Sequence, residues 1–325
     1  MTTSFFDNKP KHMAFTYLSP LKHDSSFPNF TIKPCLAPKP HSSNPNFLNI
    51  MSPITSGKIH AATTNVTTRE LSYQDEKFKT QEDQALPAGL EEDLMPKHVA
   101  FILDGNRRWA VEKGLPPMDG HAAMRITLRS ILPLCSKLNI KSVSLYAFST
   151  ENWIRPTVEV DFLMEMYEDV LRNDTLELLS LGCRITLMGN KTKLPKSFQK
   201  ACAEIEEKSK NNTGTHINYG INYSGKHDIL QACRSIVTKI KDGILVPNQI
   251  NETHFKQALY TKTNEYPYPD LVIRTSGEIR LSNFMLWQMA YSELYFTKKY
   301  FPDFEEDDLI KALLAYQETR RRVIK

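Results

Sequence analysis

The sequence predicts an α/β protein, a single domain whose mainly parallel central sheet is flanked by helices. Short apolar runs of strand length recur along residues 96–325, and segments with the apolar spacing of helices lie between them. Strands that alternate with helices form βαβ units, in which neighbouring strands run parallel. With 41% hydrophobic residues among 325, the chain can also bury a core of the required size.

Each predicted strand is an apolar run that ends in turn-forming or polar residues. The first, 99–103, ends at Asp104-Gly105-Asn106, which is a turn sequence. Further strands are predicted at 142–148, 183–188, 216–221, 271–273 and 293–296, and helices at 121–137, 157–180, 195–210 and 226–240. In open sheets of this kind ligands bind beyond the carboxyl ends of the strands. The residues that follow each strand are therefore the candidates for function.

The first 68 residues differ in composition from the rest of the chain. They are rich in Ser, Thr, Pro and Asn, contain only Asp7 and Asp24 as acids, and show no helical or strand period. A hydroxyl-rich, acid-poor segment is typical of an organelle transit peptide, and the lack of arginine before Arg69 favours a chloroplast. We predict a disordered plastid transit peptide over 1–68, a linker over 69–95 and a folded domain over 96–325. An untargeted flexible arm is the alternative to the transit peptide.

Charge, cysteines and missing motifs exclude several classes of protein. Residues 1–69 carry seven Lys or Arg and two Asp or Glu, so the whole-chain charge of +4 leaves the remainder near −1. A nucleic-acid partner is not expected, because binders of nucleic acid carry their basic surplus on the folded part. The five cysteines form no C-x-x-C pair and indicate free thiols in a reducing compartment. There is no apolar run long enough to span a membrane and no Walker A, G-x-G-x-x-G or H-E-x-x-H motif.

The turn after the first strand reads DGNRRW over residues 104–109 and combines a carboxylate, an amide and two guanidinium groups. A carboxylate suits Mg²⁺, which takes one or two protein carboxylates and completes its shell with phosphates and water. Arginine offers paired donors that match phosphate oxygens. The segment could hold a metal diphosphate, or Asp104 could simply cap a strand-to-helix turn.

Two later strand ends have the same chemical character. FSTENWIRP over 148–156 combines hydroxyl, amide, aromatic and guanidinium groups, and RTSGEIRLSN over 274–283 has two arginines six residues apart with hydroxyls between them. Three such strand ends would converge on one crevice, which favours an anion site for two phosphorylated ligands. Glu293 lies on a later strand-like segment and could equally be a solvent-facing acid.

Three segments resemble the motifs of one enzyme family. They are HVAFILDGNRRWA from His98, YAFSTENWIRP from Tyr146 and DLVIRTSGEIRLSNFMLWQMAYSELYF from Asp270. In this order and spacing they resemble cis-prenyltransferases, the family of undecaprenyl and dehydrodolichyl diphosphate synthases, over about residues 95–322. The resemblance implies a catalytic domain over 96–325, of a plant plastidial type, that condenses isopentenyl diphosphate with an allylic diphosphate.

The resemblance also implies roles for individual residues. Asp104 and Glu293 would be the Mg²⁺ ligands, with Glu293 supplied across the interface of a homodimer. Catalytic residues would be Asp104, Asn106, Ser149 and Asn152. The substrate-binding residues would be Gly105, Arg107, Arg108, Trp109, His121, Phe148, Trp153, Arg155, Arg274, Glu278, Arg280 and Ser282. Among these, Arg274, Arg280 and Ser282 would hold the isopentenyl diphosphate group, and Glu278 would couple or brace them. The proton acceptor stays open between Ser149 and the diphosphate.

Three alternatives concern partner and product. A non-catalytic partner subunit would share the fold but lose the first motif, whereas Asp104, Asn106 and Arg108 are present here. A short-chain or irregular synthase, of neryl or lavandulyl type, remains the alternative to a medium-length cis-polyprenyl diphosphate. A growing chain needs an apolar tunnel, and Phe162, Met166 and Val170 form a helical stripe of the required kind, although ordinary core packing would give the same spacing. A lipid product implies peripheral contact with a membrane at release.

Overall fold

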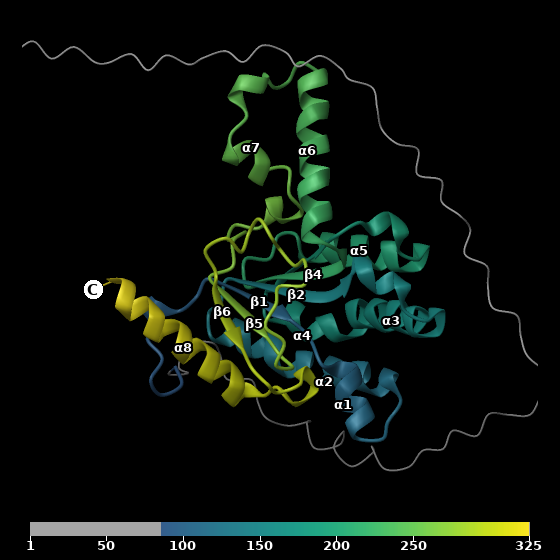
Figure 1. Cartoon of the computed structure of the whole chain (residues 1–325), viewed down its shortest axis with the longest axis vertical. Coiled ribbons are helices and arrows are strands. Elements are labelled where there is room, and N and C mark those ends of the chain that lie inside the picture. Colours follow the sequence, from purple (N-terminus) through teal and green to yellow (C-terminus); the bar gives the residue numbers. More distant parts are fainter. Residues whose placement is uncertain (1–85, 325) are drawn as a thin grey trace, which may run out of the picture. The chain divides into compact units, whose positions relative to one another are not determined.

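The computed structural model describes residues 86–324, and their central feature is a six-stranded sheet (Figure 1). The strands are β1 (His98–Ile102), β2 (Ser142–Ser149), β3 (Arg184–Met188), β4 (His216–Tyr223), β5 (Leu271–Arg274) and β6 (Glu293–Phe296). They lie in the order β3-β4-β2-β1-β5-β6, and every neighbouring pair runs parallel. The predicted fold class is thus confirmed.

Helices connect these strands much as the sequence predicts. They are α1 (Asn106–Glu112), α2 (Pro117–Lys137), α3 (Thr157–Asp169), α4 (Thr175–Ser180), α5 (Lys196–Ser209), α6 (Gly225–Lys241), α7 (Glu252–Lys256) and α8 (Glu306–Ile324). The helix predicted at 157–180 is continuous in space but contains a π-helical turn, Val170–Asp174, between α3 and α4. The short helices α1 and α7 and most of α8 go beyond the predicted elements.

The two faces of the sheet bury side chains in different ways. Alternate residues of β1, such as Val99 and Phe101, enter a large core with α2, α3, α4, α5 and α8. The intervening residues, such as Ala100 and Ile102, enter a smaller core closed by turns that contain Phe284 and Met285. This alternation follows from the two-residue period of a strand. Helices therefore dominate one face, and α6 and α7 project from the other side of the body (Figure 1).

The connections reverse direction beside β1. The chain passes from β1 to β2 on one side, whereas β5 leads to β6 on the other. Such a reversal opens a crevice beyond the carboxyl ends of the strands, where ligands bind in open α/β sheets. Asp104 follows β1 and Arg274 ends β5, so two predicted site residues meet at this position.

The described residues begin inside the predicted linker. Residues 86–95 pack on the body, since Leu90 and Met95 are buried and the Glu91 amide donates to Gln317 Oε1 of α8 at 3.0 Å. The predicted transit peptide, 1–68, lies outside the described residues. Within residues 86–324, we find no helix with the length and apolarity to cross a bilayer.

Candidate active site

Asp104 and Arg274 pair where the connections of the sheet reverse, the position at which ligands bind in open α/β sheets. Arg274 Nη2 donates to Asp104 Oδ2 at 2.7 Å, and Arg274 Nη1 donates to Ser282 Oγ at 2.7 Å and to the carbonyl of Arg280. The Arg274 side chain is only 3% exposed. The guanidinium thus links the strand-end segment 104–109 to the segment 274–283, and it fixes the orientation of the Asp104 carboxylate.

The environment of Asp104 keeps its carboxyl group ionised. Partial burial raises its pKa, but the hydrogen bond and charge of Arg274 lower it, and the amide of Gly105, which donates to Oδ1 at 2.7 Å, lowers it further. The net effect is a pKa below the ordinary value of an aspartate. Asp104 therefore offers a negative charge at neutral pH.

Gly105 is required by space as well as by backbone geometry. Its φ of +100° lies in the left-handed region. A Cβ at this position would lie 2.4 Å from Cδ1 of Tyr300 and 2.9 Å from Cβ of Ser276. Glycine therefore lets the backbone after β1 approach the loop after β5.

Arg108 and Arg280 face each other across Glu278. Arg108 Nη1 donates to Glu278 Oε1 at 3.1 Å and its Nη2 donates to Ser276 Oγ at 2.7 Å, while Nη2 lies 3.5 Å from Asp104 Oδ1. Arg280 pairs with the other oxygen of Glu278 and is 60% exposed. Both guanidinium groups keep free N–H donors, so the pair can bind a multivalent anion in the crevice.

Asn106 lies beneath this cluster. Its Nδ2 donates to the carbonyl of Leu103 at 3.2 Å, and the residue is buried. Its Oδ1 has no hydrogen-bond partner among residues 86–324. A buried acceptor of this kind gains a partner when a donor binds nearby. Neighbouring Trp109 instead anchors α1, because its Nε1 donates to Asp303 Oδ1 at 2.7 Å.

The second predicted cluster forms a braced turn after β2. The Ser149 amide donates to Asn152 Oδ1 at 2.9 Å, which fixes the turn Thr150–Ile154. Trp153 packs edge-on against Phe148 with ring centroids 5.2 Å apart, and its Nε1 donates to Asn222 Oδ1 of β4 at 2.8 Å. The hydroxyl, amide and aromatic groups therefore have fixed positions at the strand end.

Glu159 is a site residue that the sequence reasoning missed. This buried carboxylate of α3 lies 3.2 Å from Arg155 Nη1, 3.6 Å from His121 Nε2 and 3.7 Å from Arg107 Nε. The available signal was its spacing four residues after Arg155 in the first turn of a helix, where the two side chains meet. Glu159 gathers three of the predicted phosphate-binding residues into one group.

His121 is neutral at physiological pH in this group. Burial and the positive charge of Arg155 lower its pKa to about 4, although Glu159 opposes that shift. Both ring nitrogens are buried and lack a hydrogen-bond partner among the described residues. The ring can therefore donate one hydrogen bond to an oxygen that enters the crevice.

The structure does not bring Glu293 to Asp104 within one chain. Glu293 begins β6 and is paired with Leu271, the first residue of β5, whereas Arg274 ends that strand. Along the strand direction, Glu293 is therefore three residues, roughly 10 Å, from the position of Arg274 beside Asp104. No cluster of three His, Cys, Asp or Glu side chains suited to a metal exists within residues 86–324.

The remaining predicted residues join two neighbouring anion-binding groups. One group surrounds Glu159 and the other surrounds Asp104. Arg107 pairs with Glu159 and Arg108 pairs with Glu278, so consecutive residues of α1 link the two groups. Guanidinium groups at this density, close to the ionised carboxylate of Asp104, favour binding of phosphate oxygens together with a hard cation.

Comparisons with known proteins agree with this geometry. Residues 102–324 match a protein family described as "Putative undecaprenyl diphosphate synthase". Dehydrodolichyl diphosphate synthase 2 of Arabidopsis thaliana is 47% identical over 242 residues, which cover 74% of this chain and 78% of the relative. A chloroplastic nerylneryl diphosphate synthase of Solanum lycopersicum is also 47% identical, over 252 residues that cover 78% of each chain.

A solved structure extends the similarity to three dimensions. Lavandulyl diphosphate synthase from Lavandula x intermedia, in complex with dimethylallyl diphosphate, superposes with a TM-score of 0.68 at 42% identity and covers 69% of this chain and 96% of that one. The family match spans well over half of the chain and includes both anion-binding groups. The chain therefore belongs to the cis-prenyltransferases, the undecaprenyl diphosphate synthase family of prenyl-transferring enzymes.

Proposed function

We propose that this chain condenses isopentenyl diphosphate with an allylic diphosphate primer and releases a medium-length cis-polyprenyl diphosphate. The observation that carries the proposal is the pair of linked anion-binding groups at the switch point of the sheet, around Asp104 and around Glu159. Two such groups suit two diphosphate substrates, and the family performs this reaction class.

Mg²⁺ fits the Asp104 group. The carboxylate is ionised at neutral pH, is held by Arg274 and faces a crevice rich in phosphate-binding donors. One carboxylate is enough for Mg²⁺ when diphosphate and water complete its shell. When bound, the ion would offset charge on the departing diphosphate. Glu293 would serve as a second ligand only from another protomer, because it lies at the opposite end of the strands in its own chain.

The protein residues would act by binding and orientation. Asn106, Arg108 and Gly105 would hold the allylic diphosphate, while Arg107, Arg155 and neutral His121 would donate to its oxygens as the allylic C–O bond breaks. The isopentenyl double bond then forms the new C–C bond and a proton is lost from the adjacent carbon. Ser149 or the released diphosphate would accept that proton.

Isopentenyl diphosphate would bind on the Arg280 side of the Asp104 group, while the allylic diphosphate would lie between Arg108 and the group around Glu159. Arg280 is exposed and would hold its diphosphate together with Ser282, and buried Arg274 would keep that loop attached to Asp104. Phe148, Trp153, Ser149 and Asn152 would place the isopentenyl group near the allylic carbon. Orientation of two bound substrates supplies a large part of the rate in such reactions.

Product analysis tests this function directly. Purified protein would be incubated with Mg²⁺, labelled isopentenyl diphosphate and allylic primers of several lengths, and products would be resolved by reversed-phase chromatography. We expect medium-length cis-polyprenyl products. No incorporation with any primer would contradict the proposed reaction.

A short-chain product is the second candidate. Relatives named as (2Z,6Z)-farnesyl and nerylneryl diphosphate synthases are 48% and 47% identical to this chain, as similar as a dehydrodolichyl diphosphate synthase at 47%. Overall identity therefore does not separate the product classes. The same chromatography would decide, since products of twenty carbons or fewer would favour this candidate and leave the family unchanged.

We propose that the growing chain passes between β2 and the helical stripe of Phe162, Met166 and Val170, and replacement of Ala147 by leucine tests this. Ala147 is partly buried near the end of β2 beside α3, and its carbonyl accepts from Tyr167 Oη at 2.8 Å. A larger side chain at this point should narrow the space beside the helix and shift the products to shorter lengths, with the first condensation retained. An unchanged length distribution would place the growing chain elsewhere.

We also propose that the protein acts as a homodimer in a plastid. Several relatives are named chloroplastic, and the acid-poor composition of residues 1–68 supports import. Removal of 1–68 should then abolish import of a fluorescent fusion into isolated chloroplasts and leave activity intact. Import of the truncated fusion would refute the targeting proposal.

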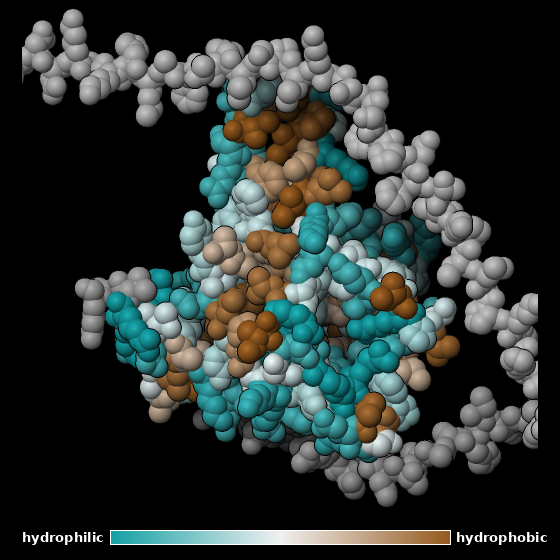
Figure 2. Space-filling model, viewed as in Figure 1, coloured by the Kyte–Doolittle hydropathy of each residue, from teal (hydrophilic) through white to brown (hydrophobic). Residues whose placement is uncertain are grey.

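Exposed apolar side chains support self-association. Val237 of α6, Ile244 after that helix, Tyr291 before edge strand β6 and Leu294 within it are exposed. Figure 2 shows apolar surface from the region of α6 and α7 down the body. Apolar surface of this extent typically marks an interface. Light scattering that gives the mass of a monomer at micromolar concentration would contradict the dimer. A lipid product would bring the protein into peripheral contact with a membrane at release. The net charge of residues 70–325, near −1, does not favour a nucleic-acid partner.

A further inference from the structure

Asn283, the last residue of the strand-end segment 274–283, joins that segment to two other strand ends. Its Nδ2 donates to Glu151 Oε1 at 2.7 Å and to Ser224 Oγ at 2.9 Å, and its Oδ1 accepts from the amide of Lys226 at 2.9 Å. Only this orientation of the side-chain amide gives the carboxylate a donor and the Lys226 amide an acceptor. Both Nδ2 hydrogens are used within the protein, so the side chain has no donor left for a substrate.

The residues that Asn283 contacts follow two different strands. Glu151 lies in the turn Thr150–Ile154 after β2, and Ser224 follows β4 and caps the first turn of α6. Asn283 itself follows β5, and β1 lies between β2 and β5 in the sheet. The contact between Glu151 and Asn283 therefore links the strand ends on the two sides of β1, whose own end carries Asp104. We call this contact the bridge.

The backbone around Asn283 has a conformation that needs support. Ser282 and Asn283 have φ of +48° and +62°, in the left-handed region that residues other than glycine adopt at a cost. The carbonyl of Ser282 accepts from Tyr146 Oη of β2 at 3.1 Å, and the carbonyl of Asn283 accepts from the amide of Gly225 at 2.7 Å. Costly backbone conformations persist where surrounding contacts fix them, and they cluster at active sites. These contacts thus hold the segment in one shape beside its substrate-binding residues.

The bridge has one charged end. Partial burial raises the pKa of Glu151, but the hydrogen bond from Asn283 and those from neighbouring groups lower it, so the pKa lies below the ordinary value of a glutamate. The carboxylate is therefore ionised at neutral pH, and a hydrogen bond to an ionised acceptor is roughly twice as strong as a neutral one. The turn after β2 and the loop after β5 are thus held together by a charge-assisted contact.

The bridge connects two sets of residues that would face opposite ends of one substrate. Asn283 directly follows Ser282, which together with Arg280 would hold the diphosphate of isopentenyl diphosphate. Glu151 directly precedes Asn152, which would place the isopentenyl group. A substrate that contacts both sets binds more tightly when their separation is fixed before it arrives, because no loop has to be ordered on binding.

We propose that Asn283 and Glu151 are positioning residues, and that the bridge between them fixes the two halves of the isopentenyl diphosphate site relative to each other. This inference rests on the proposed chain-elongating function and assigns to the bridge a part of its substrate recognition. Both residues act through their neighbours and not on the reacting atoms. The allylic diphosphate would be bound by residues outside the bridge, between Arg108 and the group around Glu159.

Kinetic constants of Glu151→Ala test the inference. Glu151 is exposed, so the variant should fold, and it removes the bridge while Asn283 keeps its contacts with Ser224 and Lys226. We expect KM for isopentenyl diphosphate to rise about fivefold or more and KM for the allylic primer to stay unchanged. A smaller folded fraction would lower the rate but would not raise KM for one substrate alone. Initial rates with each substrate varied in turn, at a saturating concentration of the other, measure both constants.

Exchange of the two side-chain groups gives a second readout. Asn283→Asp keeps an acceptor for the Lys226 amide but places a second carboxylate against Glu151, so KM for isopentenyl diphosphate should rise at least as much as in Glu151→Ala. Adding Glu151→Gln supplies an amide donor to the new carboxylate and restores the hydrogen bond with its direction reversed. We expect this double variant to return KM to within about twofold of the unmodified enzyme. If the Asn283 variants do not fold, Glu151→Ala decides the question alone.

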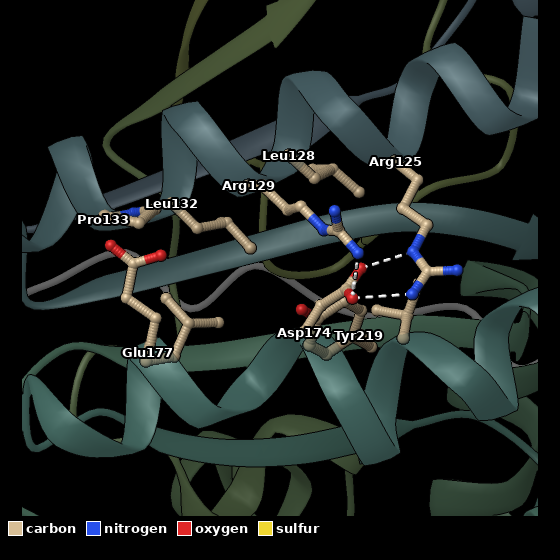
Figure 3. Close-up of a pocket in the computed structure, with 10 residues that line it drawn as sticks. Arg125, Leu128, Arg129, Leu132, Pro133, Asp174, Glu177 and Tyr219 are labelled. Carbon is tan, nitrogen blue, oxygen red and sulfur yellow. Dashed lines mark hydrogen bonds and ion pairs between the residues drawn. The ribbon is translucent and has the colours of Figure 1, made fainter. Parts of the chain in front are cut away.

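Arg129→Ala is the matched control. Arg129 Nη2 donates to Asp174 Oδ1 at 2.7 Å, the same length as the bridge, and this contact joins α2 to the π-helical turn Val170–Asp174 (Figure 3). Arg129 follows His121 by eight residues on α2, about 12 Å along the helix axis. Its removal should lower stability without a change in KM for either substrate.

The outcomes separate the bridge from the proposed function. If the unmodified enzyme incorporates isopentenyl diphosphate but folded Glu151→Ala keeps its KM for that substrate, or raises both KM values equally, the inference is overturned and the function stands. A folded double variant no better than Asn283→Asp, or the same selective rise in Arg129→Ala, would also overturn it. If the unmodified enzyme incorporates nothing, the proposed function fails and the inference fails with it.

Discussion

Replacement of Asp104 is expected to reduce turnover by about a hundredfold or more, because the variant loses the ionised carboxylate that faces the two diphosphate-binding groups. Initial rates at saturating Mg²⁺ and both substrates measure the effect. Two variants are needed, since Asp104 is also the partner of Arg274.

The two variants differ in whether Arg274 keeps a hydrogen-bond acceptor. Asp104→Ala strands the guanidinium of Arg274, which is almost fully buried, and should lower the free energy of unfolding on the order of 3 kcal/mol. Asp104→Asn keeps an oxygen that can accept from Arg274 Nη2 and should remain closer to the unmodified protein in stability. Loss of turnover in folded Asp104→Asn therefore reports the missing charge. A normal rate in that variant would remove Asp104 from the mechanism.

Arg280→Ala is expected to raise KM for isopentenyl diphosphate by about tenfold or more, the equivalent of a charged hydrogen bond of about 1.5–3 kcal/mol, with kcat little changed. The side chain is 60% exposed and its pair with Glu278 is at the surface of the crevice, so the fold should tolerate the change. The backbone carbonyl of residue 280, which accepts a hydrogen bond from Arg274, is still present in the alanine variant.

Arg321→Ala is a suitable control for Arg280→Ala. Arg321 of α8 is also a partly exposed arginine. It lies away from the crevice, and its Nη2 is 2.7 Å from Glu91 Oε1. Its removal should leave both KM values unchanged. If Arg280→Ala raised KM for the allylic primer alone, the assignment of the two diphosphate groups would have to be exchanged.

Sequence patterns determined the elements and the strand-end motifs of this protein. The six apolar runs correspond to the six strands within a few residues, because buried parallel strands need continuous apolar side chains. The three motif segments predicted the family that the comparisons then showed. Local signals of this kind depend on neighbours in the chain, and a single sequence contains them.

Only the tertiary structure decided which charged groups meet. Arg274 is 170 residues from Asp104 and was expected to face substrate, yet it is buried as the partner of that carboxylate. Glu159 collects Arg107, His121 and Arg155 from different parts of the chain, and Asp174 joins the π-helical turn before α4 to α2. Ion pairs between distant residues leave no periodic pattern in a sequence. They arise when the order of parallel strands brings strand ends and helix faces together, and that order is a property of the whole fold.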